Sequence, residues 1–85
     1  MPVLSRFFGI IIFMHWRDHA PPHFHARYGD EEVTVEIETG AAAGVMNRRA
    51  LALVQEWRLL HLNELRLDWS LAEQLRPLNR VAPLE

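Results

Sequence analysis

The sequence contains no cysteine and no lysine. Without cysteine the chain forms no disulfide, offers no thiolate to a metal ion and has no cysteine nucleophile. Without lysine it has neither the amine of a Schiff-base enzyme nor the lysine of a phosphate-binding loop. All nine basic residues are therefore arginine, and together with eleven acidic residues they give a net charge of −2. This charge argues against indiscriminate binding to nucleic acid, and the sequence contains no DNA-binding motif.

The sequence also lacks a long hydrophobic run. Its longest apolar segment, Phe7 to Met14, has eight residues, whereas a membrane-spanning helix needs about 20. No small-residue cleavage site follows this segment, as it would in a secretory signal. We therefore expect a cytoplasmic protein with no membrane contact, folded as a single domain over residues 1–85.

The residue patterns predict an α+β fold. Residues 7–15 are apolar on both faces, which is typical of a central strand, and residues 23–28 and 32–38 alternate polar and apolar around the turn signal Gly29-Asp30. Residues 47–61 and 63–76 carry apolar stripes at helical spacing, and Pro77 ends the second stripe. We expect a three-stranded antiparallel sheet followed by a helical hairpin that packs on one face.

The Gly29-Asp30 turn sets the pairing of the second and third strands. A two-residue turn pairs three polar positions on the face away from the core: His23 with Glu36, His25 with Thr34, and Arg27 with Glu32. A four-residue turn shifts these partners by two and keeps the same faces. Because the first strand is apolar on both faces, part of the outer face needs covering, and a homodimer, a small partner protein or the C-terminal tail would cover it.

Histidines are concentrated near the start of the chain. Four of the five lie within the first 25 residues. The densest segment is Asp18-His19-Ala20-Pro21-Pro22-His23-Phe24-His25. The proline pair fixes two backbone angles and cannot donate to a strand ladder, so this segment forms a rigid corner that leads into the second strand. We interpret it as a built site.

One hypothesis for this site is a divalent metal ion. His23 and His25 are two residues apart on a strand, so both imidazoles project from one face. Glu36 across the ladder would complete a set of two histidines and one carboxylate, and Asp18, His19 or His15 could serve instead. The alternative is structural, with histidines that only fix the corner through hydrogen bonds.

A second hypothesis is metal-free cleavage of RNA. Attack by a 2′-hydroxyl group needs a base, an acid and a cation on the phosphate, and it needs no nucleophile from the protein. His23 and His25 with Arg27 or Arg17 would supply these groups, while Asp18 and His19 would shape the site. A third hypothesis is a binding module without turnover that uses the same residues.

Several sequence segments resemble a known family. They are SRFFGI (5–10), DHAPPHFH (18–25), YG (28–29), IETG (37–40), RAL (49–51), EW (56–57) and PLE (83–85). Together they resemble the bacterial domain-of-unknown-function family numbered 4160, over nearly the whole chain. The resemblance implies a short protein encoded beside a small partner gene in a toxin–antitoxin-like pair. The family has no established activity. Combined with the second hypothesis above, the gene pairing suggests a toxin-like member that acts on RNA or a nucleotide.

Overall fold

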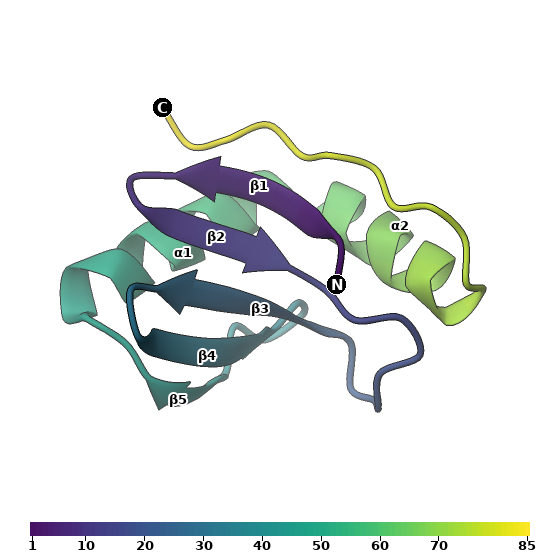
Figure 1. Ribbon diagram of the computed structural model, residues 1–85, viewed down its shortest axis with the longest axis horizontal. Helices are drawn as coiled ribbons and strands as arrows, with labels where there is room; N and C mark the ends of the chain where they lie inside the picture. Colours follow the sequence, from purple (N-terminus) through teal and green to yellow (C-terminus); the bar gives the residue numbers. More distant parts are fainter.

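The computed structural model describes residues 1–85 as a five-stranded antiparallel sheet followed by two helices (Figure 1). The elements are β1 (Val3–Phe7), β2 (Ile10–Phe13), β3 (His23–Tyr28), β4 (Glu31–Glu36), β5 (Ala42–Val45), α1 (Arg48–Leu60) and α2 (Leu62–Glu73). The strand order in the sheet is the order in the chain. The prediction of an α+β fold is confirmed, whereas the prediction of three strands is wrong.

The segment 7–15, expected as one strand, contains a turn. Phe8 and Gly9 have φ angles of +48° and +80°, and they join β1 to β2 with Phe7 opposite Ile10. Positive φ at both central residues is typical of the tightest hairpin turn, where asparagine and glycine are the usual residues. Phenylalanine is a rare residue at that position. Because Phe8 lies within an apolar run, the sequence gives no signal of a turn there.

The hairpin of β3 and β4 forms as expected. The register is that of the two-residue turn, with His23 opposite Glu36, His25 opposite Thr34 and Arg27 opposite Glu32. Gly29 in the turn has a φ of +60°. Alternation therefore predicts the faces of these two strands correctly, and of the two registers left open the structure has the one set by the two-residue turn.

The fifth strand, β5, lies outside the three strands expected from the sequence. β5 pairs with β4, with Ala42 opposite Val35, and all four of its residues are exposed. Exposed small residues give no apolar alternation, so no strand signal was present. Gly44 is required in β5 because a Cβ atom there would lie 2.6 Å from the carbonyl oxygen of Glu32.

The two helices cover one face of the sheet (Figure 1). Asn47 caps the start of α1, since its Oδ1 accepts a hydrogen bond from the Ala50 N–H at 3.0 Å. A single residue, His61, separates α1 from α2. The core combines apolar side chains of the sheet and the helices, among them Phe24, Val35, Ile37, Val54, Trp57 and Leu65. No helix is both long enough and apolar enough to cross a membrane.

The C-terminal tail runs along the outer edge of β1 (Figure 1). The Val81 N–H donates to the Leu4 carbonyl at 2.8 Å, and the Trp57 indole donates to the Ala82 carbonyl at 2.9 Å. Val81 and Leu84 are buried. The tail thus covers one edge of the sheet, while β5 forms the other edge.

Candidate functional site

The corner between β2 and β3, residues 14–22, is held by distant parts of the chain. The Arg17 N–H donates to the Ala72 carbonyl at 3.4 Å, at the end of α2. The Trp16 indole donates to the Arg76 carbonyl at 3.2 Å. These bonds fasten the corner to the end of α2 and fix the position of Asp18.

Asp18 bridges the two histidines of β3. Its Oδ2 atom lies 3.0 Å from Nε2 of His23 and 3.2 Å from Nε2 of His25. Burial acts to raise the pKa of Asp18, but the hydrogen bond from the His19 N–H and those from the two imidazoles, when Nε2 of each carries a proton, outweigh it and lower the pKa to about 2. Asp18 is therefore an ionised carboxylate at neutral pH, and both imidazoles that face it are buried.

His23 has an acceptor at each ring nitrogen. Nδ1 lies 2.8 Å from the Pro21 carbonyl oxygen, which can only accept a hydrogen bond. Nδ1 therefore carries a proton, and Nε2 of a neutral His23 would point a lone pair at the ionised Asp18. A second proton on Nε2, or a cation between Nε2 and the carboxylate, is needed to make this contact favourable.

His25 leaves one ring nitrogen without a hydrogen bond. Its Nδ1 is buried and has no partner, and the Glu32 carboxylate lies 3.5 Å away. The ring stacks on Phe13 at a centroid distance of 5.0 Å and meets the edge of His15 at 4.5 Å. Phe13 is almost completely buried although it lies on the outer face. The chain's own side chains thus cover this part of that face.

Arg27 and His19, both expected in the site, lie at its margin. The Arg27 guanidinium donates to Glu32 at 3.0 Å and lies 5.4 Å from the centre of the Phe13 ring. The His19 side chain is 83% exposed, and its ring stacks on His23 at 5.2 Å. Only Asp18, His23 and His25, of the five residues proposed for catalysis, form one cluster.

Glu36, expected as the carboxylate ligand of a metal, makes a different contact. It pairs with His23 across the ladder, but its Oε1 accepts a hydrogen bond from the Thr39 hydroxyl at 3.0 Å. The ligand atoms that lie within 4.8 Å of one another belong to Asp18, His23 and His25. The structure thus groups Asp18 of the corner, and not Glu36, with the two histidines.

A hollow of about 190 Å³ opens beside His23 on the outer face. Its lining combines polar side chains with small ones: His19, Pro21, His23, Thr34, Glu36 and Ala41–Ala43. Glu36 and His19 thus lie on the path by which a small molecule would approach His23. Alternation predicts the Thr34 and Glu36 positions, but β5, which supplies the small residues, was not expected.

Sequence reasoning missed two neighbours of the cluster. Trp69 of α2 packs against His23 with a centroid distance of 5.3 Å, and only the tertiary fold brings it there. Glu32 was expected opposite Arg27, and it also approaches His25. A diagonal neighbour on the same sheet face is within reach of a long side chain, so this contact was available from the predicted register.

Comparison with known proteins gives a family but no activity. No curated protein and no solved structure matches the chain. The family model described as "Domain of unknown function (DUF4160)" matches residues 9–70, which include the whole Asp18–His25 segment. The chain therefore belongs to the DUF4160 family, as the sequence motifs had indicated.

Proposed function

We propose that this domain binds one divalent transition-metal ion through Asp18, His23 and His25. The observation that carries the proposal is the hydrogen bond between Nδ1 of His23 and the Pro21 carbonyl. A backbone acceptor at Nδ1 fixes the tautomer in which Nε2 carries the lone pair, and this is how histidine ligands of metals are commonly oriented. That lone pair is directed at an ionised carboxylate with a second imidazole beside it.

The separations of the Asp18 oxygen from the two imidazole nitrogens suit a shared metal ion. Ligand atoms at about 2.0–2.2 Å from one metal are roughly 3.0–3.4 Å apart in octahedral or tetrahedral geometry. The two nitrogen–oxygen distances, 3.0 and 3.2 Å, fall in this range. Two imidazoles and one carboxylate favour zinc, iron, cobalt or nickel over magnesium or calcium, which prefer oxygen ligands.

Three protein ligands leave positions open for water or a small molecule. The hollow beside His23 offers access from the outer face. The three ligands come from one chain, so the set needs no residue from a second subunit. A homodimer or a small partner protein, as the sequence led us to expect, stays a prediction, as does a cytoplasmic location.

The contacts give less support to cleavage of RNA by the same residues. Nε2 of each histidine faces Asp18, and Arg27 pairs with Glu32 instead of standing free for a phosphate. A toxin-like role in a toxin–antitoxin pair stays a prediction that rests on the family resemblance. The experiment below distinguishes these functions.

The test is metal content of the untagged protein after loading with zinc, cobalt, nickel, manganese or ferrous iron and removal of free ion. We expect about one equivalent of at least one metal, and a higher affinity at pH 8 than at pH 6 because the ion displaces protons from the cluster. Cobalt would add a visible absorption that reports the ligand geometry.

His23→Gln, His25→Gln and Asp18→Asn should each lower metal affinity by about tenfold or more. His61→Gln is the matched control, since His61 pairs with Glu64 and lies outside the cluster. Each variant is checked by circular dichroism. Failure of the native, folded protein to retain any of the five ions would refute the proposal. RNA cleavage that His23→Gln and His25→Gln abolish without metal would replace it with the acid–base mechanism.

A further inference from the structure

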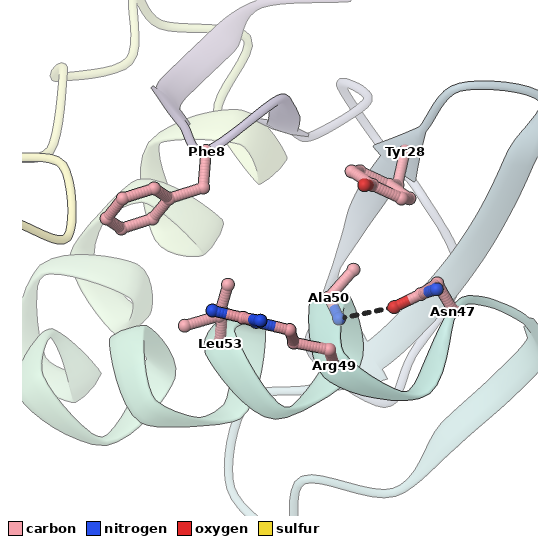
Figure 2. A pocket seen from close by; sticks show the side chains of 6 residues that line it. All are labelled: Phe8, Tyr28, Asn47, Arg49, Ala50 and Leu53. Atoms are coloured by element: carbon pink, nitrogen blue, oxygen red, sulfur yellow. Dashed lines mark hydrogen bonds between the residues drawn. The ribbon is translucent and has the colours of Figure 1, made fainter.

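A second hollow lies between the β1–β2 turn and the start of α1, away from the histidine cluster (Figure 2). Its volume is about 190 Å³, and its lining is Phe8, Tyr28, Asn47, Arg49, Ala50 and Leu53. Figure 2 shows the Phe8 and Tyr28 side chains on opposite sides, with Leu53 and the Arg49 side chain along α1 beneath them. An apolar cavity of about 150 Å³ is enough to bind benzene, so this hollow has room for one planar ring system.

Phe8 occupies a position that folding alone does not favour. It has a φ of +48°, in the left-handed region that phenylalanine rarely adopts. The residue is also 60% exposed to solvent. Asparagine would fit this turn position with less strain. A bulky residue that is both strained and exposed is common where the side chain serves in binding.

Tyr28 and Gly9 shape the opposite side of the hollow. A Cβ atom at Gly9 would lie 3.4 Å from the Tyr28 ring, so the turn packs closely against that ring. Tyr28 is nevertheless 38% exposed. The two aromatic rings thus flank the opening, while Ala50 and Leu53 give it an apolar floor.

Arg49 supplies the one positive charge. It is exposed, and the only side-chain hydrogen bond among the six lining residues joins Asn47 to Ala50 (Figure 2). A cation at the N-terminal end of a helix is unfavourable. The first turn of α1 contains no acidic residue that would balance the charge of Arg49. The Glu31 carboxylate accepts a hydrogen bond from the Asn47 N–H at 2.7 Å, and this bond holds it beside Asn47.

We propose that this hollow binds a planar ring that carries an anionic group, with the ring between Phe8 and Tyr28 and the anion at Arg49. Stacking on aromatic side chains suits any planar ring. The guanidinium forms a paired contact with a phosphate or a carboxylate. A nucleoside monophosphate and an aromatic carboxylate share this chemistry. The proposal is independent of metal binding, because the two sites have no residue in common.

The test is a titration of the ¹⁵N-labelled protein with four probes, followed by NMR. Adenosine monophosphate has both features, adenosine lacks the anion, ribose 5-phosphate lacks the ring, and benzoate is an aromatic carboxylate. We expect chemical-shift changes at residues 8, 28 and 49–53 with adenosine monophosphate or benzoate. The probe that binds more tightly tells whether the ligand is a nucleoside monophosphate or an aromatic carboxylate. Adenosine and ribose 5-phosphate should bind more weakly, and added salt should weaken binding of the anionic probes.

Three variants make the test specific. Phe8→Asn should lower affinity by roughly five- to a hundredfold through loss of stacking, while it raises the melting temperature by a few degrees because the turn is relieved. Arg49→Gln should lower affinity about two- to fivefold. Arg48→Gln removes the same charge one residue away, outside the hollow, and should leave affinity unchanged.

Two results would overturn the proposal. One is the absence of shifts at the lining residues with both adenosine monophosphate and benzoate. The other is equal loss of binding in Arg48→Gln and Arg49→Gln, which would indicate general charge attraction. A lower melting temperature in Phe8→Asn would show that Phe8 stabilises the fold, and the strain argument would then fail.

Discussion

Nε2 of His23 and Oδ2 of Asp18 lie 3.0 Å apart, on residues that follow and precede the Pro21-Pro22 pair. The prolines reverse the chain between them, so a contact across five positions becomes a hydrogen bond. The same carboxylate oxygen also reaches His25. Asp18 therefore links the corner to β3. Its ionisation state affects both the stability of the domain and the binding of any ligand.

Acid should destabilise the metal-free protein through Asp18. Its pKa is about 2 in the folded state and 3.8 in the reference state. The unfolded chain therefore binds a proton more readily, and the stabilisation present above pH 3.8 is lost as the pH falls toward 2. We expect a loss on the order of 1–2 kcal/mol over this range, after allowance for solvent screening.

Urea unfolding at pH 6 and at pH 2.5, with a chelator present, measures this loss. Asp18→Asn should be less stable than the native protein at pH 6, and the difference should be smaller at pH 2.5 and vanish only below the folded-state pKa of about 2. Parallel pH dependences in the two proteins would show that Asp18 is not responsible.

Asp68 of α2 should act in the opposite direction. Burial raises its pKa, the nearby Glu64 charge adds to this, and the hydrogen bond from the Asn79 N–H offsets part of it. The folded state therefore keeps a proton at pH values where the unfolded chain has lost it, so stability falls as the pH rises above 3.8 through the folded-state pKa. The cost persists at neutral pH, where Oδ2 of Asp68 is buried without a partner.

Asp68→Asn keeps an acceptor for Asn79 and removes the charge. We expect it to raise the free energy of unfolding at pH 7 by about 1 kcal/mol. Glu64→Gln should give a smaller gain, because it removes the neighbouring charge but also weakens the contact of Glu64 with His61. A destabilised Asp68→Asn at pH 7 would mean that the charged carboxylate has a favourable contact, and the predicted sign would be wrong.

Gly40 should tolerate no side chain because of a buried arginine. A Cβ atom at Gly40 would lie 2.7 Å from Nη2 of Arg58. Arg58 is buried and donates to the Ile37 carbonyl at 2.7 Å and to Gln55 at 3.0 Å. Gly40→Ala therefore strains the backbone at a φ of +78° and also displaces this guanidinium.

Gly29→Ala is the matched control for the backbone strain. Gly29 has a φ of +60°, but nothing lies within 4 Å of the position of its Cβ atom. We expect Gly29→Ala to cost about 1–2 kcal/mol, and Gly40→Ala to cost about 1–3 kcal/mol more through the lost hydrogen bonds of a charged group. Equal losses in chemical denaturation would show that Arg58 adapts without cost.

The parts of the fold that were predicted correctly depend on local periodicity. Alternation along residues 23–36 is sufficient for the faces of β3 and β4, because a two-residue period leaves only one face for the apolar side chains, and the two-residue Gly29-Asp30 turn then sets their register. The β1–β2 hairpin was hidden because Phe8 is a poor turn former inside an apolar run. β5 was hidden because its small, exposed residues need no pattern to pair with β4.

The candidate site divides in the same way. Its two histidines follow from the strand period, since His23 and His25 must share a face. The carboxylate does not follow from it. Asp18 reaches them because the corner is tied to α2 by the Arg17–Ala72 hydrogen bond, a contact between residues far apart in the sequence. Spacing along the strands therefore predicted Glu36 as the carboxylate beside the two histidines, whereas tertiary hydrogen bonds bring Asp18 to that position.

The C-terminal tail should be required for stability although it lies beyond the residues that match the family model, 9–70. It protects the edge of β1 through the Val81–Leu4 hydrogen bond and gives the buried Trp57 indole its acceptor at Ala82. Deletion of residues 80–85 removes two buried side chains and both of these bonds. We expect a loss of about 3–5 kcal/mol, which is a large part of the stability of a small domain.

Two substitutions separate these contributions. Val81→Ala should cost about 1–2 kcal/mol from lost burial. Trp57→Phe should be destabilising for two reasons, because it removes the indole hydrogen bond and leaves a cavity in the core. Leu75→Ala is the control, because Leu75 is 57% exposed and should change little. Hydrogen exchange of the β1 amides should accelerate in the truncated protein before that of β3 and β4, since only β1 loses a neighbour. Uniform acceleration would instead mean that the tail stabilises the domain as a whole rather than protecting one sheet edge.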